Sequence, residues 1–171
     1  MKATAAAHAN IALVKYWGKR DDALLLPEAG SLSIALDKLL TTTTVELGDF
    51  PADAFTLDGR GADPGPARKL LDAAGIRRRA RIASRNEFPT AAGLASSASG
   101  FAALAVAACA AAGLRKSAEE LSALARLGSG SAARSVPGGW AVWEGESARQ
   151  VFPPSHWDLR FCIAVCSAGP K

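Results

Sequence analysis

Residues 89–114 read PTAAGLASSASGFAALAVAACAAAGL, and this stretch is the starting point for the fold. Pro89 and Gly93 precede Ser96 and Ser97, and a run of small residues then continues to Gly113. Alanine favours a helix and glycine commonly ends one, so the stretch predicts a helix over residues 95–113. Its small side chains allow close packing against a sheet.

The start of this helix is a candidate anion site. A helix N-terminus offers unpaired N–H groups and a partial positive charge, and small residues let a phosphate approach them. A flexible turn that ends in a helix cap explains the same residues. Neither the GxxxxGK[ST] loop nor the GxGxxG fingerprint occurs in the chain, so the pattern is of another kind.

The rest of the chain mixes strands and helices without a regular repeat, which favours an α+β fold over a doubly wound sheet. Alternating and β-branched patterns predict strands at residues 3–14, 31–37, 41–47, 80–88, 140–144 and 159–167. Two further helices are expected at 67–75 and from Ser117, whose pairing with Glu120 is a capping box, to Gly128. Residues 48–66 are rich in Gly, Pro and Asp and are expected to be mostly loop.

Two other segments carry polar groups suited to anions. GSGSAAR (128–134) offers serine hydroxyls, an approachable backbone and the bidentate fork of Arg134. KYWGK (15–19) places two lysines beside aromatic rings, which strengthen a lysine–anion contact by lowering the local dielectric. Taken alone, the first also fits a linker with a surface arginine, and the second fits a solvated loop.

Composition narrows the function classes. The chain has 171 residues, 49% of them apolar and 21% charged, with a net charge of +4, as in a globular domain. Three cysteines and two histidines without a CxxC pair argue against a zinc site. The longest apolar run, 101–112, is too short to span a bilayer, and no secretory signal is evident, so a cytoplasmic location without membrane attachment is expected.

A basic cluster at residues 77–85 raises nucleic-acid binding as an alternative. No stacking aromatic residues are interleaved with these arginines, and alternation puts Arg79 and Arg81 on one side of a strand. A solvated sheet face explains this cluster better, so no nucleic-acid partner is expected.

Three segments together resemble the mevalonate diphosphate decarboxylases of the GHMP kinase superfamily. They are ANIALVKYWGKRD (9–21), PTAAGLASSASGFAALA (89–105) and GSGSAARSVPGGW (128–140), in that order. The resemblance implies a GHMP kinase N-terminal domain fold over residues 1–171, with a mixed sheet backed by helices and an ATP site. It also implies a C-terminal domain that lies outside this chain.

The activity implied by the resemblance is ATP-dependent decarboxylation of (R)-5-diphosphomevalonate. The products would be isopentenyl diphosphate, ADP, phosphate and carbon dioxide, with ATP and Mg²⁺ as cofactors and a homodimer at full length. ATP first phosphorylates the tertiary hydroxyl, and loss of that phosphate and of the carboxylate then forms the alkene. A related GHMP kinase acting on mevalonate or its phosphate, or a non-catalytic binding fragment, are the alternatives.

The resemblance also assigns site residues. The expected catalytic pair is Lys15 and Arg134. The expected substrate contacts are Asn10, Tyr16, Lys19, Ser129, Gly130, Ser131 and Arg134. The expected ATP contacts are Pro89, Ala92, Gly93, Leu94, Ala95, Ser96 and Ser97. No residue of the chain is expected to ligate a metal ion.

Two departures from the family pattern stand out. Ala29 and Gly30 occupy positions where many members carry an Asn-Ser pair before the strand that starts at Ser31. The family's catalytic aspartate belongs to a segment that would follow Lys171. The chain alone is therefore expected to lack activity.

Overall fold

The sheet is organised around β4 (Ser31–Gly48), an 18-residue strand with neighbours along both edges. β1 (Lys2–Val14) pairs antiparallel along one edge. The other edge is shared, because β8 (Trp140–Glu144) pairs with the first part of β4 and β7 (Arg79–Asn86) with the last part. The structure is a computed structural model that describes residues 1–15, 17–90 and 93–164.

The remaining strands extend the sheet to the order β6-β5-β7-β4-β8-β9, with β1 beside β4. β5 (Ala54–Leu57) runs parallel to β7, whereas β6 (Arg60–Ala62) and β9 (Ser147–Phe152) pair antiparallel with their neighbours. One parallel pair among antiparallel ones makes the sheet mixed. β2 (Lys19–Asp21) and β3 (Leu26–Pro27) form a separate hairpin.

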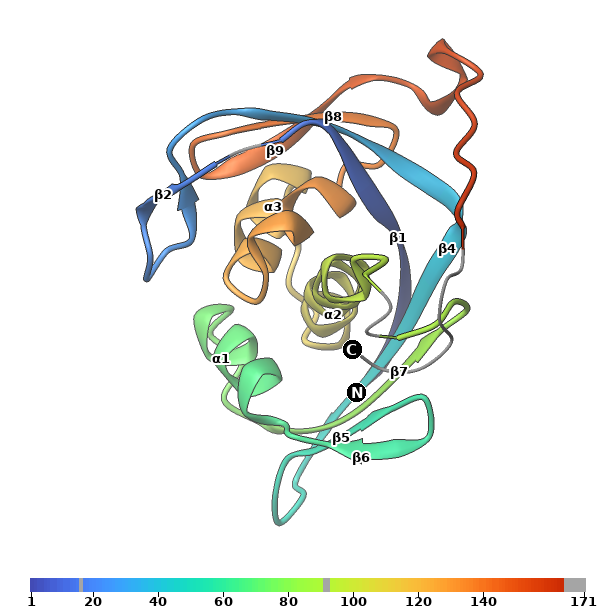
Figure 1. The fold of residues 1–171 in the computed structure, drawn as a ribbon. Coiled ribbons are helices and arrows are strands. Elements are labelled where there is room, and N and C mark those ends of the chain that lie inside the picture. The colour runs from blue at the N-terminus through green and yellow to red at the C-terminus, as the bar shows by residue number, and fades with distance from the viewer. Residues whose placement is uncertain (16, 91–92, 165–171) are drawn as a thin grey trace.

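The helices lie within the curve of the sheet (Figure 1). They are α1 (Gly65–Ala73), α2 (Ser96–Ala111) and α3 (Ala118–Arg126), together with the short 3-10 helix η1 (Gly130–Ser135). A second 3-10 helix, η2 (Pro154–His156), follows β9 and has no buried residue. α2 packs against β1, β4, α3 and η1, and most of its small residues are buried. The expected mixed sheet backed by helices is thus confirmed. Among the residues that the structure describes, no helix is both long and apolar enough to cross a bilayer.

Several local predictions are confirmed. The predicted helix 95–113 is α2, and Gly113 follows it with a φ of 72°. The capping box forms as expected: the Ser117 hydroxyl accepts from the Glu120 N–H, and the Glu120 carboxylate accepts from the Ser117 N–H. In β7 the exposed and buried positions alternate, which puts Arg79 and Arg81 on the solvated face.

Other predictions were wrong. The two strands expected at 31–37 and 41–47 are one strand, β4, because β1 pairs with both parts of it. The strand continues through the exposed residues Asp37 and Lys38, where the pairing with β1 shifts register. The expected loop 48–66 contains the β5–β6 hairpin, and β9 was not anticipated. Residues 159–164 of the expected strand 159–167 are not a strand; residues 165–167 lie outside the described part.

Candidate active site

A buried arginine joins three elements at the centre of the candidate site. Arg134, in η1, donates from Nε to Asn10 Oδ1 at 3.2 Å and from a terminal nitrogen to Ser31 Oγ at 2.7 Å. Asn10 lies in β1 and Ser31 begins β4. All three residues are at most 6% exposed. The guanidinium stays charged, so this arrangement holds a positive charge at a fixed position inside the protein.

The amide of Asn10 fixes η1 against β1. Its Nδ2 donates to the Ser131 carbonyl at 3.0 Å and to Ser135 Oγ at 2.7 Å, while Oδ1 accepts from Arg134. The buried ring of Trp143 in β8 packs beneath Arg134, with the guanidinium carbon 5.7 Å from the ring centroid. Because contacts from three strands, β1, β4 and β8, converge on η1, its backbone has little freedom at this point.

The two serine-rich segments meet. Ser97 Oγ, in the first turn of α2, lies 3.4 Å from Ser129 Oγ, which lies 3.3 Å from Ser131 Oγ. Ser131 also accepts from Asn10 through its carbonyl, so the serine row and the Arg134 cluster share a residue. The structure therefore brings together Asn10, Ser97, Ser129, Ser131 and Arg134, which the sequence spreads over 125 positions.

The start of α2 has the open geometry of an anion site. Gly93 and Ala95 have positive φ values of 81° and 55°, and Ala95, the N-cap residue, makes no side-chain cap. The first turn contains no acidic residue. The Ala98 N–H donates to the Ala95 carbonyl at 2.9 Å, but no side chain caps the N–H groups before it, and the helix dipole adds positive potential there.

The side chains of the two lysines in the KYWGK segment contact residues of their own loop. Lys15 and Lys19 are exposed; Lys15 Nζ lies 4.8 Å above the Trp17 ring, and Lys19 Nζ lies 3.1 Å from Asp22 Oδ1. Val14 pairs with Leu32, so the Lys15 backbone lies beside the start of β4 at Ser31. Tyr16 and Ala92, both expected site residues, lie outside the described residues.

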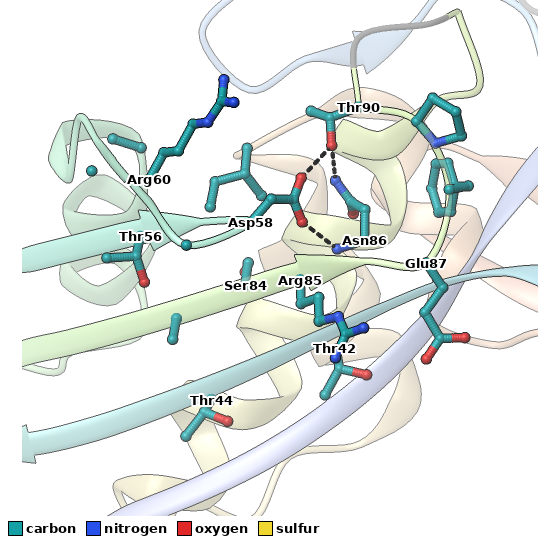
Figure 2. Close-up of a pocket in the computed structure, with 17 residues that line it drawn as sticks. Thr42, Thr44, Thr56, Asp58, Arg60, Ser84, Arg85, Asn86, Glu87 and Thr90 are labelled. Atoms are coloured by element: carbon teal, nitrogen blue, oxygen red, sulfur yellow. Dashed lines mark hydrogen bonds between the residues drawn. The ribbon is translucent and has the colours of Figure 1, made fainter. Parts of the chain in front are cut away.

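A cleft of 1020 Å³ adjoins Pro89 and Thr90, which precede the loop around Gly93 (Figure 2). Its walls are the β5–β6 hairpin, the end of β7 and residues 87–90, so it reaches Pro89 and Thr90. Charged groups from both signs line it: Asp58, Arg60, Arg85 and Glu87. Asp58 and Arg60 were not predicted from the sequence, although the LDGRG turn at 57–61 is typical of a hairpin tip.

Asp58 is the anchored acid of this cleft. Its oxygens accept from the Asn86 N–H at 2.8 Å and from the Thr90 hydroxyl at 2.6 Å. Burial raises the pKa of this carboxyl, but hydrogen bonds from Thr90 and Asn86 and the nearby Arg85 outweigh burial, so its pKa is lowered. Asp58 is therefore ionised at neutral pH and acts only as an acceptor.

Comparison with known proteins identifies the family. The family pattern described as the diphosphomevalonate decarboxylase-like N-terminal domain matches residues 7–151. The chain belongs to this family. The resemblance of its three motifs to mevalonate diphosphate decarboxylases is thereby confirmed.

Individual relatives of this family agree. Diphosphomevalonate decarboxylases of Rattus norvegicus and Homo sapiens are each 44% identical to the chain, over 98% of its length and 49% of theirs. Among solved structures, the Staphylococcus aureus mevalonate diphosphate decarboxylase matches with a TM-score of 0.82 and 43% identity. The match covers 91% of the chain and 51% of the Staphylococcus aureus protein. The chain thus spans about half the length of these relatives, and the expected fold is confirmed.

One solved relative was crystallised with ligands. It is described as MDDEF in complex with MVAPP, AMPPCP and magnesium. It is 43% identical to the chain with a TM-score of 0.81, over 88% of the chain and 50% of its own length. That protein of the family therefore binds a nucleotide analogue, magnesium and MVAPP together.

Proposed function

We propose that the chain forms the nucleotide- and substrate-binding half of an ATP-dependent diphosphomevalonate decarboxylase. Residues 1–171 would be the N-terminal, ATP-binding domain, and the rest of the protein would supply the second wall of the site. With Mg²⁺ bound to the nucleotide, the reaction would convert (R)-5-diphosphomevalonate and ATP into isopentenyl diphosphate, ADP, phosphate and carbon dioxide. The observation that carries the proposal is the 3.4 Å contact of Ser97 with Ser129, which joins two anion cradles into one site.

The first cradle would hold ATP. Its phosphates would lie against Gly93–Ser97, where the α2 N–H groups are uncapped, and its nucleoside in the cleft that ends at Thr90. Pro89, Ala92, Leu94 and Ala95 would shape this loop. In the described ranges, no group of three His, Cys, Asp or Glu side chains is placed to hold a metal. Mg²⁺ would therefore be held mainly by phosphate oxygens and water.

The second cradle would hold 5-diphosphomevalonate. Ser129, Gly130 and Ser131 would hold its diphosphate, and Arg134 its carboxylate, which a guanidinium fork suits. Lys15 would approach the reacting hydroxyl, and Tyr16 and Lys19 would contact the anionic ends of the substrate. Asn10 already holds both Ser131 and Arg134, so it would set the spacing between the two substrate groups.

These groups match the electrostatic demand of the reaction. Two polyanions must lie side by side while the γ-phosphoryl group passes to the tertiary hydroxyl. Loss of that phosphate and of the carboxylate then leaves the alkene, and fixed positive charges offset the repulsion at each step. A small-molecule substrate, a cytoplasmic location and a full-length homodimer are parts of the same proposal.

Product analysis tests this function. The protein, at the length at which its source makes it, is incubated with MgATP and diphosphomevalonate labelled in the carboxylate. Release of labelled carbon dioxide in step with ADP is the expected result. ADP with a phosphorylated product but no carbon dioxide would indicate the kinase alternative, and neither product would indicate a binding fragment.

A further inference from the structure

A network of hydrogen bonds joins Thr90, which lies before the loop around Gly93, to Ser99, which lies after it. Asn86 is the central residue of this network. Its Nδ2 donates to Thr90 Oγ1 at 2.6 Å, and Thr90 donates to Asp58 Oδ2 at 2.6 Å (Figure 2). Its Oδ1 accepts from Thr41 Oγ1 at 2.6 Å, and Thr41 Oγ1 lies 2.7 Å from Ser99 Oγ. Thr90 precedes the loop and Ser99 lies in the first turn of α2 after it.

The direction of donation along this network follows from Asp58, its outermost member. Asp58 is ionised and can only accept, so the one hydroxyl hydrogen of Thr90 is donated to it. Thr90 must then accept from the NH₂ of Asn86, which turns Oδ1 toward Thr41. Thr41 donates to that oxygen, so in its 2.7 Å contact with Ser99 the hydrogen comes from Ser99, whose hydroxyl has the Ser96 carbonyl as a second acceptor at 3.2 Å. The three bonds from Thr41 through Asn86 and Thr90 to Asp58 all point toward Asp58, an arrangement in which each bond polarises the next.

Burial increases along this hydrogen-bond network from Asp58 to Ser99. Thr41 and Ser99 are completely buried, Asn86 and Thr90 are half-buried, and Asp58 is exposed. Water is excluded from the inner end, so an unmade bond there would leave a buried polar group unsatisfied. The direction of the inner bonds is thus set by a carboxylate at the surface.

We propose that Asp58, Thr90, Asn86, Thr41 and Ser99 are positioning residues that hold both ends of the phosphate-binding loop at a fixed separation. The inference rests on the proposed function, because it takes residues 93–97 as the loop that receives the ATP phosphates. Fixing the two ends would keep the N–H groups of that loop in place before the nucleotide arrives, which lowers the entropic cost of binding.

Amide hydrogen exchange without nucleotide tests the network directly. Thr90→Val keeps the shape of the side chain but removes both of its hydrogen bonds. The hydrogen-bonded amides at the start of α2, beginning with the Ala98 N–H that donates to the Ala95 carbonyl, are therefore expected to exchange about three- to tenfold faster. Thr90→Ser keeps the hydroxyl and should restore slow exchange. Thr4→Val is the matched control, since it breaks a comparable exposed bond to Thr44 of 2.9 Å elsewhere in the sheet. It should leave the exchange of these amides unchanged.

Calorimetric titration of the natural-length protein with AMPPCP and Mg²⁺ tests whether these hydrogen bonds strengthen nucleotide binding. Thr90→Val should weaken affinity about three- to tenfold relative to the unsubstituted chain, Thr90→Ser and Thr4→Val. Unchanged exchange in Thr90→Val, or unchanged affinity despite faster exchange, would overturn the positioning role. No binding by the unsubstituted natural-length protein would instead overturn the proposed nucleotide site, and with it any role of the network in ATP binding.

Discussion

At the scale of single residues, Arg134 shows how a charge is kept inside the protein. A buried guanidinium is costly unless its hydrogens are used and its charge is partly offset. Asn10 Oδ1 and Ser31 Oγ accept from it, and the Trp143 ring lies beneath it. These contacts hold the guanidinium fork in one orientation. A held positive charge of this kind suits an anionic substrate group.

Replacing Arg134 tests both its packing and its proposed role. Arg134→Ala leaves the acceptors Asn10 Oδ1 and Ser31 Oγ without this donor, so unfolding in urea should show a loss of about 2 kcal/mol. Decarboxylation by the natural-length protein should fall by about 100-fold or more, since a desolvated arginine–carboxylate contact is lost.

Arg134→Lys and Arg149→Ala separate these effects. The lysine variant keeps the charge but loses the fork, so its turnover should stay well below that of the unsubstituted protein. Arg149 is exposed in β9, and its replacement should change neither stability nor turnover appreciably. Full turnover in Arg134→Lys would contradict bidentate recognition.

Gly93 offers a second test at this scale. Its φ of 81° lies in the left-handed region, which β-branched residues adopt only with strain. Gly93→Val should therefore distort the loop and weaken AMPPCP–Mg²⁺ binding by about tenfold or more, measured by calorimetry. Equal affinity in the variant would remove this loop from the nucleotide site.

At the scale of elements, α2 depends on small residues for its place in the core. Ala102, Ala105 and Ala108 are completely buried, and the helix contacts the sheet, α3 and η1 at once. An alanine-rich helix can approach on several sides because no long side chain holds its neighbours away. This close approach brings Ser97 to Ser129.

Two glycines near α2 should respond in opposite ways to alanine. A Cβ at Gly100, inside the helix, meets open space, so Gly100→Ala should stabilise the protein by about 0.5–1 kcal/mol. A Cβ at Gly128 would clash with the Phe101 ring, so Gly128→Ala should destabilise by about 1–3 kcal/mol. Chemical unfolding measures both. Similar values for the two variants would contradict the packing of α2 against the Gly128 turn.

The elements also show what a sequence can predict. α2 and the Ser117 capping box were predicted because local propensity and hydrogen bonding decide them. The continuity of β4 across Asp37 and Lys38 was not, because it depends on pairing with β1, far away in the chain. Asp58 was missed for the same reason: its partner Thr90 lies 32 residues along the chain. The motifs singled out Asn10, Ser129 and Arg134 as candidates, but the contact between Asn10 and Arg134 came only from the fold.

At the scale of the whole molecule, Asp53 ties β7 and α1 to the segment before β5. Its carboxylate, 8% exposed, accepts from the Ala80 N–H at 2.8 Å and lies 3.2 Å from Arg79 and 3.5 Å from Arg68. Burial raises the pKa of this group, but these hydrogen bonds and charges outweigh burial and hold its pKa below the ordinary 3.8. The ionised form therefore stabilises the fold.

The stability should depend on pH accordingly. A lowered folded-state pKa gives stability that is present above the ordinary pKa and is lost as the pH falls through the lowered one. Asp53→Asn should lower the free energy of unfolding at pH 7 by about 1–3 kcal/mol, with the difference shrinking below pH about 4. Asp49→Asn, at an exposed ion pair with Arg78, should change it by less than about 1 kcal/mol. A difference for Asp53→Asn that stays constant down to pH 2 would contradict the ionised role.

α2 and the Ser129–Ser131 segment are proposed to form one site for two phosphorylated ligands. A crystal structure of the natural-length protein with AMPPCP, Mg²⁺ and diphosphomevalonate would show both ligands at once. We expect the nucleotide phosphates to lie against Gly93–Ser97, the substrate diphosphate against Ser129–Ser131, and the substrate carboxylate at Arg134. Both ligands bound away from these residues, with the Ser97–Ser129 junction empty, would contradict it.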